Sequence, residues 1–197
     1  MHEESSREVL FEQLSLLYSD MEEAYDTVAD KIGLSCDGCR DNCCDSFFHH
    51  HTHIEWAYLW EGMRFCSDET RQALISKSKA YLEQTQSRPP QGQKPGVMCP
   101  LNDKGLCRLY KHRLMICRMH GVPNRLVRPD GKAFSFPGCV RSQELCTNLE
   151  QVPVLDRTEL YRRLAALEMA FLGPKIKALA KVNLTLAEMI VKGPLKL

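Results

Sequence analysis

Closely spaced cysteines constrain this chain more than any other feature of its sequence. Four of its 10 cysteines fall within one short stretch, in the order Cys36-x2-Cys39-x3-Cys43-Cys44. A chain of 197 residues can bury an ordinary hydrophobic core, so it does not need sulfur bridges to fold. Because clustered thiolates are soft donors that capture zinc, copper(I) or iron–sulfur units, the spacing predicts loops that gather around a metal.

A second group of cysteines lies further along the chain. A C-x2-C turn lets two sulfurs approach one ion at about 2.3 Å each, and Cys36 and Cys39 have that spacing. Adjacent side chains diverge, so we expect Cys43 and Cys44 to serve two sites or one multinuclear cluster. Together these thiolates suffice for two zinc ions, for one zinc ion plus an iron–sulfur cluster, or for one cluster with spare ligands. The predicted metal ligands are Cys36, Cys39, Cys43, Cys44, Cys99, Cys107, Cys117 and Cys139.

The composition sets the expected compartment and partners. No apolar run approaches the roughly 18 residues of a membrane span, and the acidic start Met1-His2-Glu3-Glu4 precedes no signal-peptide core. We therefore predict a cytoplasmic protein without a membrane partner, in which clustered cysteines are ligands or redox groups rather than disulfides. Residues 99–141 carry nine Lys/Arg and two Asp/Glu. They lack the interleaved aromatic residues of single-strand binders, so the sequence disfavours nucleic-acid binding.

Helical periodicity dominates the rest of the chain. Apolar residues recur at steps of three and four over residues 3–32, which predicts one amphipathic helix ended by Gly33. Pro129-Asp130-Gly131 predicts a hairpin, and Thr185 with Glu188 matches a capping box for a short last helix. The expected fold is mainly α with a small β-hairpin component, a single α-rich domain around cysteine-bearing metal-binding loops. Further helices are expected over 54–65, 68–84 and 160–171, the second of them capped by Ser67 or Asp68. Asp103-Lys104-Gly105 predicts a turn between Cys99 and Cys107.

The chain is expected to have three consecutive parts. Residues 1–34 form the N-terminal amphipathic helix, residues 35–150 the cysteine-cluster metal-binding domain, and residues 151–197 a C-terminal helical extension that packs on that domain. A Pro- and Gly-rich connector over residues 86–98 is not taken as a boundary, because predicted ligands lie on both sides of it.

The cysteine pattern resembles that of a known family. The two stretches that carry the likeness are Cys36-Asp-Gly-Cys39-Arg-Asp-Asn-Cys43-Cys44 and Cys99-Pro-Leu-Asn-Asp-Lys-Gly-Leu-Cys107-Arg-Leu-Tyr-Lys-His-Arg-Leu-Met-Ile-Cys117-Arg, followed by Gly138-Cys139. They resemble the zinc- or iron-chelating domain proteins that are named for a CxxCxxCC cluster (YkgJ-like). The resemblance covers about residues 36–141. Flagellin lysine methylases are similar in carrying a related cluster, which is associated with an iron–sulfur centre.

The resemblance implies metal chelation by zinc or iron, including iron in a 4Fe–4S cluster. This chain departs from the family pattern in two places. Three residues rather than two precede the Cys43-Cys44 pair, and Arg113-Leu114 stands where the family has Arg-Pro. The second change removes a fixed φ angle before Cys117. Neither change removes a thiol, so the implied ligand set is complete.

Histidines are a second class of candidate ligand. They are His49, His50, His51, His53 and His120, and the spacing does not decide whether any of them binds the metal. Cys66, at the apolar end of a predicted helix, is expected to be a small buried residue. Cys146 lies outside the family pattern and is a spare candidate.

Three functions are compatible with these residues. The first is metal chelation by zinc or iron, with a redox or electron-transfer role for an iron–sulfur centre. The second is a structural zinc module whose helices bind a protein partner. The third is a thiol redox or metal-delivery protein in which Cys43 and Cys44 are oxidised or pass on a metal. No Walker loop, G-x-G-x-x-G or G-x-S-x-G motif is present, so the sequence assigns no catalytic residue.

Overall fold

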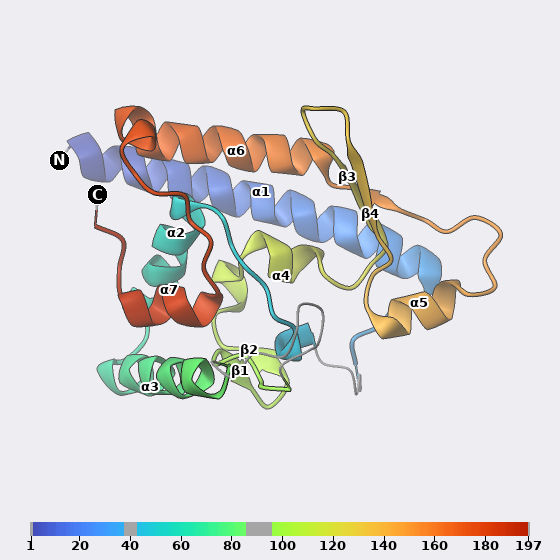
Figure 1. The fold of residues 1–197 in the computed structure, drawn as a ribbon, viewed down its shortest axis with the longest axis horizontal. Coiled ribbons are helices and arrows are strands. Elements are labelled where there is room, and N and C mark those ends of the chain that lie inside the picture. The colour runs from blue at the N-terminus through green and yellow to red at the C-terminus, as the bar shows by residue number, and fades with distance from the viewer. Residues whose placement is uncertain (1, 38–42, 86–95, 197) are drawn as a thin grey trace. The chain divides into compact units, whose positions relative to one another are not determined.

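The computed structural model describes residues 2–37, 43–85 and 96–196 of the chain. The fold is mainly α-helical with a small β component, as predicted (Figure 1). The α-helices are α1 (His2–Ile32), α2 (His53–Arg64), α3 (Asp68–Thr85), α4 (Met115–Met119), α5 (Val140–Cys146), α6 (Thr158–Leu172) and α7 (Leu186–Lys192). The 3-10 turns are η1 (Cys43–Asp45), η2 (Tyr110–His112) and η3 (Gly173–Lys177). The strands are β1 (Asn102–Asp103), β2 (Leu106–Cys107), β3 (Asn124–Val127), β4 (Ala133–Phe136) and β5 (Leu155–Asp156).

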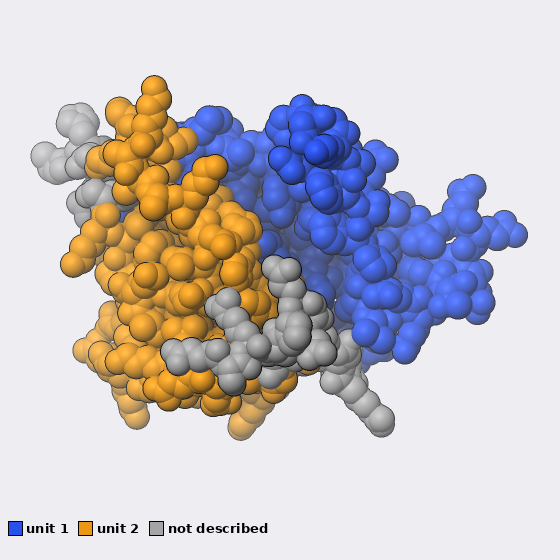
Figure 2. Space-filling model, in the orientation of Figure 1, with its two compact units in different colours: residues 1–43, 115–171 blue, residues 44–114, 172–197 orange. Residues whose placement is uncertain are grey.

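Contacts divide the chain into two compact units, coloured separately in Figure 2. Unit 1 comprises Met1–Cys43 and Met115–Phe171, and unit 2 comprises Cys44–Leu114 and Leu172–Leu197. One chain boundary between the units therefore falls between the two adjacent cysteines of the first cluster. This division differs from the three consecutive segments expected from the sequence. The organisation into those three segments stays a prediction. The predicted connector over 86–98 lies mostly outside the described residues.

Unit 1 is built on the long helix α1. Most apolar positions expected to form one face are buried, among them Leu14, Leu17 and Met21, each at most 1% exposed, whereas Leu10 and Tyr25 are half-buried. Gly33 ends the helix with a φ of +67°, and the next residue donates its N–H to the Ala29 carbonyl at 2.8 Å. The helix α6 runs beside α1 in Figure 1, with stacked Phe rings between them. The sequence therefore predicted this helix and its buried face correctly.

A three-stranded sheet completes unit 1, in the strand order β4-β3-β5. The hairpin β3–β4 has the turn predicted at Pro129-Asp130-Gly131, and β3 also pairs in parallel with β5. The helix α5 and the strand β5 were not predicted. A strand of two residues is too short to show an alternation of apolar and polar residues in the sequence. The strand β5 forms because it pairs with β3, which is distant in the chain, and the Leu155 N–H donates to the Pro123 carbonyl at 2.9 Å.

Unit 2 packs α2, α3 and α7 around an apolar core. Trp60 anchors α2 to α7, because its indole N–H donates to the Met189 carbonyl at 3.0 Å. The predicted capping box of α7 is present, with the Thr185 hydroxyl accepting from the Glu188 N–H at 3.2 Å. The core residues are Leu59, Trp60, Met63, Leu74, Leu101, Leu109, Leu114, Val182, Leu186, Met189 and Ile190.

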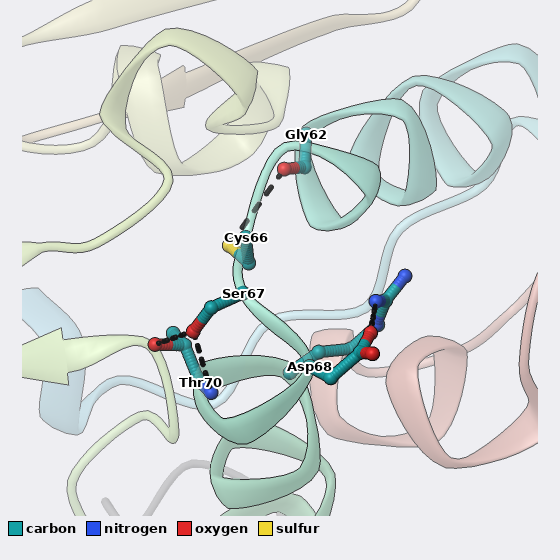
Figure 3. A network of polar contacts seen from close by, with 6 residues as sticks. Gly62, Cys66, Ser67, Asp68 and Thr70 are labelled. Carbon is teal, nitrogen blue, oxygen red and sulfur yellow. Dashed lines mark hydrogen bonds and ion pairs between the residues drawn. The ribbon is translucent and has the colours of Figure 1, made fainter.

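The start of α3 follows the predicted capping chemistry, drawn in Figure 3. The Ser67 hydroxyl accepts from the Thr70 N–H at 3.2 Å, and Asp68 pairs with Arg71 one turn along. Just before it, the Cys66 thiol donates to the Gly62 carbonyl at 3.8 Å (Figure 3). Cys66 is thus held by its own helix end, and it is partly rather than fully buried as expected, because it lies past the last residue of α2 at the edge of the core. Within the described ranges, no helix combines the length and apolar character needed to cross a bilayer.

Candidate metal centre

Unit 2 brings three of the predicted ligands into one neighbourhood. The Cys99 N–H donates to the Cys44 carbonyl at 2.7 Å, so the two chain segments touch through their backbones. The short hairpin β1–β2 then returns the chain, with Asn102 opposite Cys107. The predicted turn at Asp103-Lys104-Gly105 makes this possible, because Lys104 and Gly105 both adopt positive φ angles (52° and 92°). A local hairpin and one long-range hydrogen bond therefore bring the chain segments of Cys44, Cys99 and Cys107 together.

The electrostatics of Cys99 reflect this gathering. The pKa of its thiol is raised to about 12, chiefly by burial, and the charges of Cys44 and Cys107 raise it further. Opposing them, the backbone N–H groups of Leu101 and Asn102 hydrogen-bond the sulfur and stabilise its negative form. Such amides directed at sulfur are what a metal-thiolate loop needs. The turn thus favours a thiolate only where a cation replaces the proton.

Unit 1 gathers further predicted ligands near the C-terminal end of α1. The Cys139 N–H donates to the Gly121 carbonyl at 3.0 Å, which joins the start of α5 to the segment that follows α4 and Cys117. The Arg141 guanidinium donates to the Asp37 carbonyl at 3.3 Å, which joins α5 to the loop that carries Cys36. The backbone therefore brings together the segments of three predicted ligands. Cys36 is exposed, and Cys117 and Cys139 are partly exposed.

Gly138 positions Cys139. The sequence did not predict this role, because it shows only that a glycine precedes the cysteine. Its φ is +84°, and a Cβ there would lie 2.7 Å from the Ser142 hydroxyl and closer still to the Gly121 carbonyl. Only glycine fits this approach without displacing its neighbours. In α2, Gly62 is similar: a Cβ there would lie 2.5 Å from the His112 ring. Each unit thus uses a glycine to let two segments meet.

The predicted ligand set extends beyond the described residues. Across the described ranges 2–37, 43–85 and 96–196, no three His, Cys, Asp or Glu side chains form a group that could hold one ion. Cys39 and the Cys43 side chain lie outside what is described. No disulfide joins any of the other eight cysteines. The predicted gathering of all the ligands thus stays a prediction, and Cys146 lies at the end of α5.

The histidines are placed by backbone pairing in unit 2. His50 forms a β-bridge with Leu184 and is 1% exposed. Burial, followed by the charges of His51 and His49, lowers the pKa of His50 to about 3. The His49 Nδ1 lies 2.9 Å from the Asn183 side-chain oxygen, while its Nε2 is enclosed and has no hydrogen-bond partner among the described residues. His51 is exposed and His53 begins α2. Whether any of these side chains, or His120 in unit 1, binds metal stays open.

The chain matches no protein-family model, no curated protein and no solved structure among those with which it was compared. The resemblance carried by the cysteine spacing therefore stays a prediction. What the residues themselves offer is a set of soft sulfur donors in two places, one of them with backbone amides already directed at a thiol.

Proposed function

We propose that this protein chelates zinc or iron through the cysteines of its loops, iron being held as an iron–sulfur cluster such as 4Fe–4S. The observation that carries the proposal is the Cys99 turn, where the backbone of Leu101 and Asn102 favours the thiolate of Cys99, and where the Cys99 N–H holds the Cys44 carbonyl at 2.7 Å. Donors of this kind suit zinc and iron better than hard cations, which prefer oxygen. The remaining ligands would come from the other predicted cysteines.

The same turn argues for a metal rather than for free thiol chemistry at this position. A redox thiol needs a thiolate near neutral pH, which requires a lowered pKa. The pKa of Cys99 is instead raised to about 12. A bound metal ion removes the conflict, because its positive charge displaces the proton and balances the neighbouring thiolates. A cytoplasmic, reducing compartment belongs to this proposal, since it keeps the thiols available.

The experiment is an oxygen-free purification of the full chain, with an absorption spectrum and an iron and zinc count. An iron–sulfur centre gives a brown protein, and zinc gives a colourless one. The variant Cys99→Ser is expected to lose at least one metal equivalent, whereas Cys66→Ser keeps the full count. Cys66 is the matched control because it lies in the same unit and its thiol bonds the Gly62 carbonyl, a contact that serine reproduces. Finding neither iron nor zinc in the wild-type protein would end the proposal.

A further inference from the structure

Arg157, which lies between β5 and α6 in unit 1, is a buried cation without a counter-charge. The residue is 8% exposed, and its guanidinium lies 4.2 Å from the Phe136 ring centroid and 5.0 Å from that of Tyr161. Within the described part of the chain its side chain makes no ion pair and no hydrogen bond, and its Nε is enclosed without a partner. Burial accordingly lowers the pKa of Arg157 below its ordinary value.

Other arginines of unit 1 have carboxylate partners. Arg125 pairs with Asp156 at 2.7 Å, and Arg128 pairs with Asp130 at 3.5 Å. Stacking on two rings offsets only part of the desolvation of Arg157. Of the Arg157 nitrogens, only Nε is fully enclosed, so the two terminal nitrogens still reach the surface. A planar guanidinium with free terminal N–H groups is suited to bind a carboxylate through both of them.

The strand next to this guanidinium is an open sheet edge. In the order β4-β3-β5, β4 is the outer strand, and all four of its residues are exposed. On the side of β3 that faces away from β4, two backbone groups are hydrogen-bonded. The Arg125 carbonyl accepts from the Arg157 N–H at 3.0 Å, and the Val127 N–H donates to the Thr158 hydroxyl at 2.9 Å. Since these groups alternate along a strand, Leu126 and Asn124 are the residues whose groups face β4.

The pairing register then shows which β4 groups point outward. Phe134 and Phe136 lie opposite Leu126 and Asn124, so their N–H and C=O groups face β3. The backbone groups of Ala133 and Ser135 therefore face away from the sheet, and no described residue pairs with them. Unpaired groups of this kind are a template for a further strand.

We propose that the β4 edge and Arg157 form a docking site for an extended acidic peptide segment of a partner protein. The peptide lies along Ala133–Phe136 and hydrogen-bonds the outward groups of Ala133 and Ser135. Its next strand position is about 4.8 Å from β4, which puts a side chain on the Phe136 face within reach of the Arg157 guanidinium. A glutamate or aspartate there supplies the missing carboxylate.

A peptide fits these features better than a nucleic acid does. A nucleic-acid strand makes no use of a row of backbone N–H and C=O groups. Arg157 already covers one face of the Phe136 ring, which leaves less of it for base stacking. Two basic groups of the hairpin, Arg125 and Arg128, are paired with carboxylates, and Lys132 is exposed in its turn. The buried charge without a carboxylate partner among the described residues is thus one guanidinium beside a strand edge, and this suits one acidic side chain on an extended chain.

The test uses full-length protein and fluorescence anisotropy with a labelled hexapeptide of alternating Glu and Val. We expect saturable binding, at least about tenfold tighter than that of the alternating Lys and Val peptide or of a labelled oligo-dT of similar length. The variant Arg157→Gln is expected to weaken peptide binding by about tenfold or more, as the loss of a charged, two-point hydrogen bond implies. Its matched control is Arg162→Gln, which removes an equal charge from an exposed α6 position paired with Glu159.

A second pair of variants tests the strand edge. Ser135→Pro removes one outward N–H but leaves the hydrogen bonds between β3 and β4 intact, since Ser135 and its partner Arg125 form a pair that exchanges none of them. We expect it to weaken peptide binding about tenfold, whereas Ser135→Ala, which keeps the N–H, binds as the wild type does. Circular dichroism and melting establish that each variant is folded. If Arg157→Gln does not fold, Ser135→Pro decides the question alone.

Three results would overturn the proposal. The first is no binding of the acidic peptide, and the second is oligo-dT binding as tight as that of the peptide. The third is equal affinity of a folded Arg157→Gln or Ser135→Pro protein and its control. None of these measurements depends on metal content, so the outcome is independent of the proposed chelation.

Discussion

The two units assemble their cysteines by different means. In unit 2, a hairpin of a few residues places Cys107 near Cys99, and one backbone bond of 2.7 Å adds Cys44. In unit 1, Cys36, Cys117 and Cys139 sit on three separate segments that meet only because the chain packs against α1. The unit 2 group is therefore mostly local in sequence, whereas the unit 1 group depends on the folded core. Substitutions that disturb packing should harm the second group more than the first.

The largest expected effect is the loss of metal from one unit at a time. If the two groups belong to separate centres, Cys99→Ser and Cys139→Ser each remove part of the metal, and the double variant removes the sum. Cys66→Ser, between α2 and α3, is the control, since Cys66 does not belong to the predicted set and its thiol bonds the Gly62 carbonyl. Elemental analysis of oxygen-free preparations gives the counts. Complete loss of metal from either single variant would contradict separate centres.

The next effect in size distinguishes the glycines that let segments meet. Gly138→Ala adds a Cβ against the Gly121 carbonyl at a φ of +84°, so both strain and overlap apply, and we expect a loss of about 3 kcal/mol in unfolding free energy. Gly62→Ala adds a Cβ that overlaps the His112 ring, but the residue has an ordinary helical φ. We therefore expect a smaller loss of about 1 kcal/mol in unfolding free energy.

Gly131→Ala is the control for backbone strain alone, because its φ is +80° and no atom lies within 4 Å of the added Cβ. It should lose about 1 kcal/mol. Urea unfolding of the three variants with metal removed provides the comparison. A Gly138→Ala protein no less stable than Gly131→Ala would show that the Cys139 segment tolerates displacement.

The sequence predicted features set by local chemistry. The periodicity of apolar residues predicted α1 and its buried face. Ser67 and the Thr185–Glu188 pair predicted where two helices begin. Asp103-Lys104-Gly105 predicted the turn between β1 and β2, which brings Cys107 back. Features that depend on distant contacts were missed. The strand β5 exists because β3 lies beside it, and the stacking of Arg157 on Phe136 joins residues about twenty positions apart. Neither leaves a pattern that a single sequence displays.

The two units should also respond differently to acid. In unit 2, burial lowers the pKa of His50 to about 3, so the folded state stays neutral where the unfolded state takes up a proton. This leaves stability unaffected above pH 6.5 and lowers it as pH falls from 6.5 toward 3. We expect a loss of about 2 kcal/mol between pH 8 and pH 5 from this group. His50→Phe should flatten that slope.

In unit 1 the corresponding group is Asp156, whose pKa is lowered to about 2, first by hydrogen bonds from Thr158. Its contribution is present above pH 3.8 and disappears as pH falls toward 2, a window well below that of His50. Melting of metal-free protein across the pH range measures both. A wild-type stability that is flat between pH 8 and pH 5 would contradict the account of His50.

The smallest effects compare how each unit caps a short helix. In unit 2, Thr185 caps α7 with a complete capping box, so Thr185→Ala should lower the unfolding free energy by about 1 kcal/mol. In unit 1, Cys139 occupies the N-cap of α5 without a side-chain capping bond, although its φ of −72° and ψ of 169° suit one. Helix stability therefore does not explain a cysteine at this position, and the proposed chelation gives it a different role.

The substitution Cys139→Ser separates these two roles. Serine is among the preferred N-cap residues, and its hydroxyl can accept from an open N–H of the first turn of α5. With metal removed by a chelator, the variant should therefore be about 0.5–1 kcal/mol more stable than the wild type. With metal present, the order should reverse, because the wild type gains binding free energy that the variant lacks. Thermal melting under both conditions tests this, and the same order in both would show that Cys139 takes no part in holding a metal.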